Sequence, residues 1–304
     1  MSVAARDRST RLAEHALDRP LAAVLAQSPG DACRLFWLGQ AGFVIEAKGR
    51  RIVIDPYLSD SLAEKYRGRR FDHRRMMPTP VLPDAIGHID AVLATHAHTD
   101  HMDPQTLGPM LAANPHAVLV APASARAPAL ERAGIAASRL IGIDAGETAA
   151  LLPGLRVTAT RAAHETMERD ADGRHLFLGY GMAFAGGPTI VHSGDTVPFD
   201  GQIEEVAALG ADLALLPVNG RDAARRAGGI PGNMRVDEAI ALCTHAGIPA
   251  MIAHHFGMFA FNTVPRGEIE AAARKADAVH AVPARVAMVY RLGRSAPGRT
   301  GAGR

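Results

Sequence analysis

Residues 95–103 read Thr-His-Ala-His-Thr-Asp-His-Met-Asp, and this stretch decides how the rest of the chain is interpreted. The largely apolar run 89–94 leads into it and predicts a buried strand. Asp103 followed by Pro104 then predicts a helix start, with a capping carboxylate and a proline at the first helical position. Three imidazoles and a carboxylate therefore lie on a short loop at the carboxyl end of a strand, a typical place for an open site in an α/β protein.

The side chains of this loop are of the kind that binds divalent metal ions. Neutral imidazole and carboxylate are ligands for Zn²⁺ and similar ions. His96 and His98 are two positions apart and can point to the same side of an extended turn, while Asp100 and His101 can serve a second ion. The alternative is a polar loop with coincidental histidines, but four ligands in six positions are difficult to obtain by chance.

The composition describes an ordinary globular chain. At 304 residues, of which 48% are hydrophobic and 21% charged, it can bury a core of good size as one large domain or two small ones. The net charge of +2 gives no reason to expect a nucleic-acid partner. Cys33 and Cys243 are far apart, which predicts no disulfide framework and fits a reducing, cytoplasmic location. We expect no signal peptide and no membrane insertion, since no apolar run reaches the length of a bilayer span.

Strand and helix patterns alternate along the chain and predict an α/β fold. Residues 34–38, 43–47 and 51–55 read as three early strands, and helices alternate with strands after the loop at 95–103. Between them, the arginine-dense loop 56–83 is either functional, as long loops often are, or a solvated basic segment.

Three parts of unequal size are expected from these patterns. We expect residues 1–32 to form a peripheral N-terminal segment with a loose helix, and residues 33–292 to form the main domain. Residues 293–304 are rich in glycine, arginine and serine and predict a disordered tail.

The spacing His-x-His-x-Asp-His in residues 96–101 resembles the signature of the metallo-β-lactamase superfamily, and the resemblance extends from about Leu35 to Phe261. It implies a hydrolase domain over residues 33–292, folded as a four-layer αββα sandwich of two mixed β-sheets, where the alternation alone indicates only α/β. It also implies one or two divalent metal ions, with Zn²⁺ as the first choice and Mn²⁺ or Fe²⁺ as alternatives.

The resemblance implies further ligands at the ends of later strands. His164, after the strand expected at 156–161, would complete the ligand set of the first ion. Ser193-Gly194-Asp195 matches the family's Ser-Gly-Asp motif, in which Asp195 would bridge two ions or bind one. Zinc β-lactamases that hydrolyse antibiotics commonly have cysteine at this position, so the aspartate argues against that activity.

His254 and His255 offer two alternatives for the last ligand. Neighbouring side chains point to opposite sides of a strand, so one of the two is expected to reach the metal. The family pattern of histidine, aromatic residue and glycine favours His255, with His254 supporting it or facing the substrate, and His254 as the ligand remains the alternative. The implied metal ligands are thus His96, His98, Asp100, His101, His164, Asp195 and His255.

A narrower resemblance indicates a branch of the superfamily. Residues 78–83, residues 192–195 and the paired histidines look like L-ascorbate-6-phosphate lactonases, which are related to phospholipase D-like hydrolases of N-acyl-phosphatidylethanolamine. Two positions depart from the pattern. Asn233 stands where the phospholipase-like relatives usually have histidine, and His164 stands where the lactonase often has aspartate.

The activity that this resemblance implies is hydrolysis of a small anionic ester or lactone by a metal-bound hydroxide. Asp100 and Asp195 are the candidate catalytic residues, and Asp100 would also carry a proton. Two alternatives are a phosphodiesterase of the phospholipase D-like type and a metal-binding protein without catalysis. The complete ligand set disfavours the second.

Substrate contacts are expected from residues outside the metal ligands. Arg75 matches an arginine of the lactonase-like pattern and would hold a phosphate or carboxylate, with Arg74 or Arg161 beside it. His254 and Asn219 are the other candidates for binding a small anionic substrate. The arginine-rich loop and residues 258–261 could form the contact of a homo-oligomer.

Overall fold

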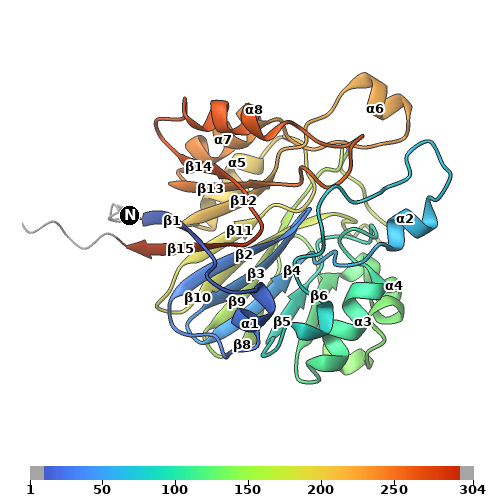
Figure 1. Ribbon diagram of the computed structural model, residues 1–304, viewed down its shortest axis with the longest axis vertical. Helices are drawn as coiled ribbons and strands as arrows, with labels where there is room; N and C mark the ends of the chain where they lie inside the picture. The colour runs from blue at the N-terminus through green and yellow to red at the C-terminus, as the bar shows by residue number, and fades with distance from the viewer. Residues whose placement is uncertain (1–9, 295–304) are drawn as a thin grey trace, which may run out of the picture.

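Two mixed β-sheets form the centre of the molecule (Figure 1). The computed structural model describes residues 10–294. In order across the first sheet, the strands are β1 (Thr10–Ala16), β15 (Met288–Arg294), β2 (Cys33–Gly39), β3 (Gly42–Ala47), β4 (Arg50–Ile54), β5 (Ala91–Leu93), β6 (Val118–Pro122) and β7 (Leu140–Ile143). Across the second they are β14 (His280–Pro283), β13 (Ala250–His254), β12 (Leu213–Pro217), β11 (Thr189–His192), β10 (Leu178–Phe184), β9 (Leu155–Arg161) and β8 (Thr148–Leu152).

Alternating side chains divide the early strands between two cores. In β2, Leu35 and Trp37 belong to the core between the sheets, whereas Phe36 lies in a second core on the outer face. The same alternation places Ile45 of β3 between the sheets and Val44 outside. Since both faces of these strands are buried, the strands read as nearly continuous apolar runs in the sequence.

Helices cover the outer face of each sheet and complete four layers (Figure 1). On the first sheet they are α1 (Leu21–Leu25), α3 (Pro104–Ala113) and α4 (Arg126–Ala133), and on the second α5 (Gln202–Ala208), α7 (Val236–Ala246) and α8 (Arg266–Ala273). Three single 3₁₀ turns lie at Pro83–Ala85, Ala123–Ala125 and Ala137–Arg139. The predicted αββα sandwich is confirmed, and α3 begins after Asp103, whose carboxylate accepts from the backbone N–H of Gln105.

The N-terminal segment agrees with its prediction only in part. Helix α1 lies within it, but residues 10–16 form strand β1, because β15 offers a complete antiparallel partner from Thr10↔Arg294 to Ala16↔Met288. Pairing to a sheet edge outweighs the local helix preference of an alanine-rich stretch. The predicted tail at 293–304 falls partly in β15, and residues 295–304 lie outside the described residues, as do 1–9.

A buried arginine ties the following segment to the first sheet. The guanidinium of Arg51 is fully buried, pairs with Glu46 at 2.5 Å and donates to the carbonyl oxygens of Leu25 at 2.6 Å and Gln27 at 2.7 Å. A buried charge needs such partners. The segment predicted to be peripheral is therefore anchored in the same fold as the main domain.

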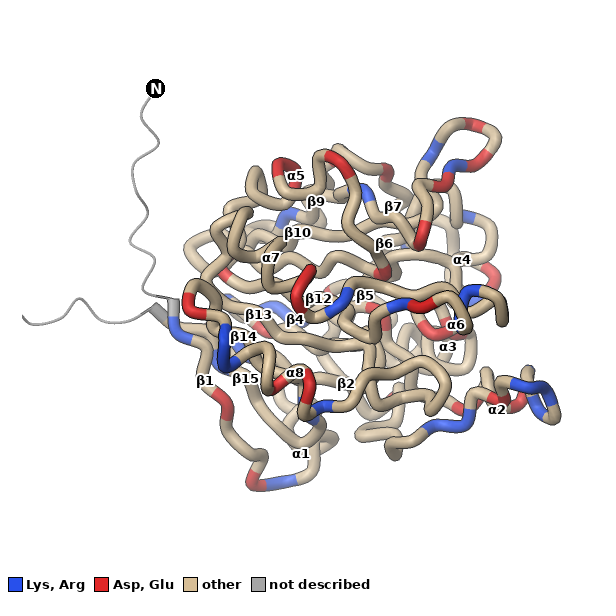
Figure 2. The backbone as a smooth tube through the Cα atoms, turned by 90° about the horizontal axis from the view of Figure 1, so that it is seen from above, with Lys and Arg blue, Asp and Glu red and all other residues tan. Residues whose placement is uncertain are grey.

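Two short helices project at the end of the sandwich opposite β1. They are α2 (Ser61–Lys65) and α6 (Ala223–Ala227), and both Figure 1 and Figure 2 show them at this end. In the described part of the chain, no helix is both long and apolar enough to cross a bilayer. The carboxyl ends of β5, β9, β11 and β13 lead into loops at the same end, and these loops carry the predicted metal ligands.

Candidate metal centre

The predicted metal ligands converge at the carboxyl ends of strands from both sheets. β5 leads into the loop at 95–103, and β9, β11 and β13 precede His164, Asp195 and His255. Among the described residues, three overlapping groups have ligand atoms that all lie within 4.8 Å of one another. They are His96, His98 and His164; His96, His101 and Asp195; and Asp100, His101 and His255.

Asp195 lies between the two ends of this cluster. Its Oδ2 atom is 3.0 Å from Nε2 of His255, 3.4 Å from Nε2 of His101 and 3.9 Å from Nε2 of His164. One carboxylate oxygen is thus within reach of imidazoles from both groups. This is the position of a residue that bridges two ions or supports either one.

Buried atoms without partners show that the cluster fits a divalent ion. Nδ1 of His96 lies 3.1 Å from Oγ1 of Thr95, and Nδ1 of His101 lies 2.8 Å from Oδ2 of Asp55. The Nε2 atoms of both histidines are buried without a hydrogen-bond partner, as is Oδ1 of Asp195. Leaving such atoms unpaired is costly, and bound cations would satisfy them together.

Burial prepares one group of imidazoles to be neutral ligands. It lowers the pKa of His96 well below its ordinary value, lowers the pKa of His98, and brings the pKa of His164 to about 4. A neutral imidazole binds a metal without first losing a proton.

His101 behaves in the opposite way. Burial acts to lower its pKa, but the carboxylates of Asp195, Asp55 and Asp100 together raise it well above the ordinary value. For Asp195, burial favours the neutral acid, yet His255 and His101 hold its pKa well below the ordinary value. Without metal, the centre therefore contains a protonated His101 beside ionised carboxylates.

This contrast predicts that metal binding releases a proton. A cation at His101 must displace its proton, so affinity for that ion should fall by about tenfold for each pH unit below the pKa of His101. The group of His96, His98 and His164 should show no such dependence near pH 7, because these imidazoles are already neutral. Calorimetric Zn²⁺ titrations in buffers of different ionisation enthalpy should show the release of about one proton for each ion bound at His101. Binding without any proton release would contradict the assignment of His101 as a ligand.

Of the two adjacent histidines, His255 reaches the cluster. It has a φ of 61°, which turns its ring toward Asp195 directly after strand β13 ends. His254 is fully buried between the sheets, where its ring stacks on His192 at 4.7 Å and meets Phe43 edge-on at 5.5 Å. His254 is therefore placed neither as the ligand nor as a substrate contact.

Asp55 is a supporting residue that sequence reasoning missed. It is fully buried, and its carboxylate accepts from the Thr95 backbone N–H at 2.8 Å, from the Thr95 hydroxyl at 2.7 Å and from Nδ1 of His101. A carboxylate in this position fixes both the tautomer and the orientation of a metal-binding imidazole. Its signal in the sequence is an aspartate directly after an apolar strand, the same place that the ligands occupy.

Gln40 is a second missed residue, on the tight turn between β2 and β3. It is buried with a φ of 48°, and its Nε2 donates to Oδ2 of Asp100 at 2.9 Å and lies 3.2 Å from Nε2 of His255. The backbone carbonyl oxygen of Gln40 accepts from the backbone N–H of His255 at 2.9 Å and from the indole N–H of Trp37 at 3.0 Å. Gln40 thus links two ligands that are far apart in sequence.

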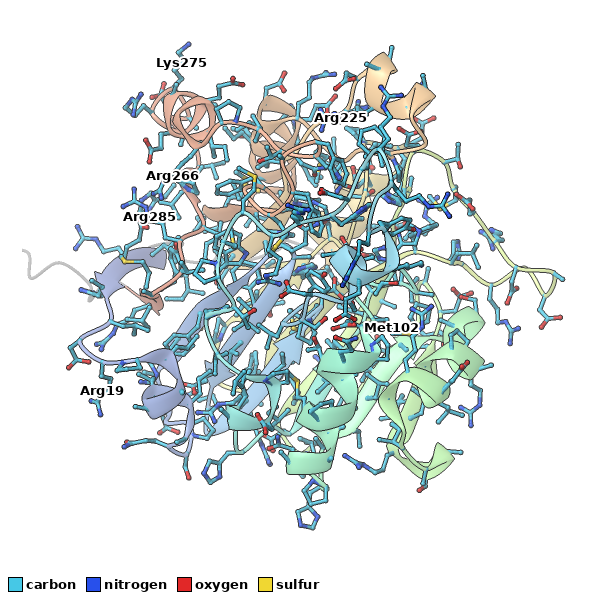
Figure 3. All side chains as sticks on the ribbon, turned by 45° about the vertical axis from the view of Figure 1, so that its right-hand side comes forward. Arg19, Met102, Arg225, Arg266, Lys275 and Arg285 are labelled. Atoms are coloured by element: carbon cyan, nitrogen blue, oxygen red, sulfur yellow. The ribbon has the colours of Figure 1, made fainter. Side chains whose placement is uncertain are left out.

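The loop at 95–103 is held from the helices behind it. Arg132 of α4 donates to the carbonyl oxygen of Ala97 at 2.5 Å and to that of the buried Met102, which is labelled in Figure 3, at 3.3 Å. Gly194 is required for a different reason: it has a φ of 62°, and a Cβ there would lie 2.3 Å from the carbonyl oxygen of Leu178. Glycine is needed at this position to place Asp195.

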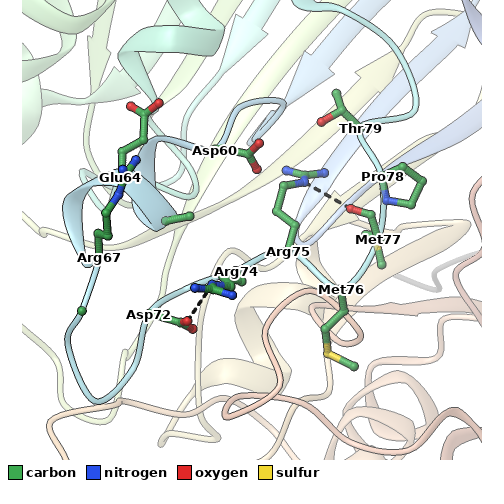
Figure 4. A pocket seen from close by; sticks show the side chains of 12 residues that line it. Asp60, Glu64, Arg67, Asp72, Arg74, Arg75, Met76, Met77, Pro78 and Thr79 are labelled. Atoms are coloured by element: carbon green, nitrogen blue, oxygen red, sulfur yellow. Dashed lines mark hydrogen bonds and ion pairs between the residues drawn. The ribbon is translucent and has the colours of Figure 1, made fainter.

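Arg75 is held by backbone carbonyl oxygens of its own segment. Its guanidinium donates to the carbonyl oxygens of Tyr57 at 3.0 Å, Ser59 at 3.3 Å and Met77 at 3.3 Å, and stacks on the Tyr57 ring. It lines a neighbouring pocket of about 750 Å³ (Figure 4). These bonds hold the turn of segment 56–83, while Nη2 of Arg75 is buried without a hydrogen-bond partner, and the anion-binding role stays a prediction.

Three other residues predicted to contact the substrate, Arg74, Arg161 and Asn219, pair with other side chains of the protein. Arg74 pairs with Asp72 at 2.9 Å in the pocket of Figure 4, and Arg161 pairs with Glu205 on the outer side of the second sheet. Asn219 is buried and donates to Oδ1 of Asn262 at 2.8 Å. Instead of a phospholipase-like histidine, Asn233 donates to Asn219 at 3.0 Å and completes a polar network behind the pocket.

The cluster forms the floor of a pocket of about 1210 Å³. Segment 56–83 supplies one wall, and the loop after α6 and the loop after β13 supply the others. His98, Asp100, His164, Asp195 and His255 are exposed to it, and its other charged lining residues are cations: Lys65, Arg69, Arg70 and Arg132.

An αββα sandwich whose strand ends bring a histidine–aspartate cluster to the floor of a pocket defines a class, the metal-dependent hydrolases of the metallo-β-lactamase fold. The Beta-lactamase superfamily domain matches residues 50–256, and the chain belongs to that superfamily.

Curated relatives include proteins named as metal-dependent hydrolases. A UPF0173 metal-dependent hydrolase of Rubrobacter xylanophilus is 28% identical over 80% of this chain and 89% of that protein. Another, from Aeropyrum pernix, is 30% identical over 62% of this chain and 71% of that protein. Among solved structures, the metallo hydrolase Igni18 of Ignicoccus hospitalis matches with a TM-score of 0.60 and 22% identity, over 84% of this chain and 94% of that one. The chain is a metal-dependent hydrolase.

Proposed function

We propose that the chain hydrolyses a small anionic ester or lactone, in the manner of the L-ascorbate-6-phosphate lactonases that its sequence resembles. One observation carries this proposal. The histidine–aspartate cluster forms the floor of a pocket whose remaining charged side chains are all cationic. A positive rim around a hydrolytic centre attracts and orients a negatively charged substrate.

The side chains divide between two ions. His96, His98 and His164 would hold one, Asp100, His101 and His255 the other, and Asp195 lies between them. Zn²⁺ suits this donor set, and Mn²⁺ or Fe²⁺ would also be accepted. Bound there, such ions lower the pKa of water and polarise the carbonyl oxygen of the substrate.

Asp100 is the candidate for moving the proton. Its side chain lines the pocket, and although burial favours the neutral acid, His101 and His255 lower its pKa, so it is a carboxylate at neutral pH. Gln40 donates to one carboxylate oxygen and thereby fixes the orientation of the group. Asp100 can accept a proton from the water as it attacks the carbonyl carbon, and return that proton to the leaving oxygen as the ester C–O bond breaks.

A phosphodiesterase of the phospholipase D-like type is the second candidate. The cationic rim of Lys65, Arg69 and Arg70 favours it as well, since a phosphodiester is itself an anion.

A cytoplasmic location belongs to the same proposal, because Cys33 and Cys243 are buried free thiols.

A substrate panel distinguishes the candidates. The Zn²⁺-loaded protein should be assayed with anionic lactones and esters, their neutral counterparts, thioesters and phosphodiesters. The proposal expects the anionic lactones or esters to have the highest kcat/KM, about tenfold or more above their neutral counterparts. A preference for phosphodiesters would establish the second candidate, and equal rates on neutral and anionic esters would contradict the role of the cationic rim.

A further inference from the structure

An unusual share of the aromatic residues lines the pocket above the metal centre. The whole chain has 9 Phe, 4 Tyr and 1 Trp. Three of these phenylalanines and one tyrosine lie in this pocket: Tyr66, Phe71, Phe259 and Phe261. Such a concentration in a chain that is 5% aromatic indicates an apolar surface that serves the pocket.

The rings form one connected wall together with His73. The ring of His73 stacks on Tyr66 with a centroid distance of 4.3 Å and meets Phe259 at 5.1 Å and Phe261 at 4.7 Å. Phe261 lies 4.9 Å from Phe71 and nearly parallel to Phe259. Tyr66, Phe71 and Phe261 are only partly buried, so part of each ring is exposed.

Positive charge is placed beside these rings by the same segment. Lys65 lies over the Tyr66 ring at 5.2 Å, and Arg70 over the Phe71 ring at 5.1 Å. Within residues 10–294, the structure gives Lys65, Arg69 and Arg70 no carboxylate partner. Figure 2 shows this run of basic residues around α2, at the end of the molecule that carries the pocket.

We infer that the anionic substrate carries an apolar ring, which packs on the aromatic wall while its negative group pairs with Arg69 and Arg70. The inference rests on the proposed hydrolysis of an anionic ester or lactone and adds the chemistry of the group attached to it. A pocket of about 1210 Å³ has room for such a group beside the metal centre. A small sugar derivative would leave the wall unused and in contact with water.

A competing explanation is purely structural. The rings could serve only to hold segment 56–83 against the loop after β13, because Phe71 and Tyr66 come from the first and Phe259 and Phe261 from the second. In that case the wall would stabilise the fold and give no preference among ligands.

Three small probes separate these explanations. They are 4-phenylbutyrate, which has both ring and charge, butyrate, which has the charge alone, and 4-phenylbutan-1-ol, which has the ring alone. Binding to the Zn²⁺-loaded protein is measured by calorimetry. We expect 4-phenylbutyrate to bind roughly tenfold or more tightly than either other probe, the size of effect that burial of a phenyl ring gives. Added salt should weaken the binding of the two anions but not of the alcohol.

Two sets of variants locate the effect. Phe261→Ala should remove most of the advantage of 4-phenylbutyrate over butyrate, and Phe261→Leu, which keeps apolar volume, should remove less. Arg69→Ala combined with Arg70→Ala should reduce the advantage of 4-phenylbutyrate over the alcohol about threefold or more. Arg67→Ala is the matched control, an exposed arginine of the same segment that lines the pocket of Figure 4 instead. Phe199→Ala controls for loss of a half-buried ring elsewhere.

The binding affinities of the three probes test the inference independently of the hydrolysis rates, which test the proposed function. Equal affinity for 4-phenylbutyrate and butyrate in the wild-type protein would overturn the inference, as would a Phe261→Ala variant with lower thermal stability but the wild-type ratio of affinities. If the ring preference appears and the substrate panel shows no hydrolysis, the proposed function fails, and the preference for a ring with a negative charge stands as a binding property of the pocket. If anionic esters are hydrolysed without any ring preference, the proposed function stands and the inference fails.

Discussion

Replacing Asp195 with alanine is expected to reduce turnover by about a thousand-fold or more and to lower the metal content of the purified protein. The carboxylate lies within 3.0–3.9 Å of three imidazoles that come from different loops. Its loss would leave those imidazoles and any bound cations without the negative charge between them. Steady-state kinetics on the best substrate of the panel, together with elemental analysis, measure both effects.

Asp200→Ala provides the matched control for this variant. Asp200 is an exposed aspartate five positions further along the same loop, and it does not line the pocket above the metal centre. It should keep wild-type kinetics and wild-type metal content. Turnover of Asp195→Ala within a few-fold of the wild-type value would contradict the assignment of Asp195 to the centre.

Replacing Asp55 with asparagine is expected to weaken metal binding by about 10- to 100-fold, although Asp55 is not itself a ligand. Its carboxylate accepts three hydrogen bonds that orient His101 and the start of the metal loop. Asparagine keeps the size of the side chain but replaces one acceptor oxygen with a donor, which faces the Thr95 N–H or the His101 ring unfavourably. Competition with a chelator for Zn²⁺ measures the change in affinity.

A second variant separates orientation of the ligand from general destabilisation. Thr95→Val removes one of the three donors to Asp55, together with the contact of that hydroxyl to Nδ1 of His96, and leaves the contact between Asp55 and His101 in place. It should weaken metal binding less than Asp55→Asn does. Equal loss in both variants, matched by equal loss of thermal stability, would show that the network acts on the fold and not on the ligand.

The metal centre was largely predictable because most of its ligands belong to short sequence motifs. His96, His98, Asp100 and His101 occupy one short loop, and each later ligand follows an apolar strand. The later ligands were implied by the family resemblance, which brings the strand ends of the two sheets together at one end of the sandwich. The αββα sandwich was predictable from the resemblance, which the family match confirms.

The supporting residues could not be predicted, because their partners are distant in sequence. Gln40 meets Asp100 across 60 positions and His255 across 215. Aspartate and glutamine are common residue types, and a strand end or a turn gives them no distinctive spacing. Only the closed fold shows that their side chains reach the ligands.

The surroundings of Arg75 were not predicted, for a related physical reason. An arginine next to a proline-rich run looks available for an anion, but backbone carbonyl oxygens of a long loop also need donors. Arg75 satisfies those of Tyr57, Ser59 and Met77, whereas Arg69 and Arg70, a few positions earlier, line the pocket over the metal cluster. The aromatic wall escaped prediction because half of it comes from Phe259 and Phe261, nearly 200 positions later in the chain than Tyr66.

The central claim is that seven side chains from four loops bind divalent cations on the floor of one pocket. The most direct measurement is a crystal structure of the protein with Zn²⁺, using anomalous scattering at the zinc edge. We predict anomalous peaks at about 2.0–2.3 Å from His96, His98 and His164 and from Asp100, His101 and His255, with Asp195 beside them. Zinc bound only elsewhere, or no peak within coordinating distance of these residues, would contradict the claim.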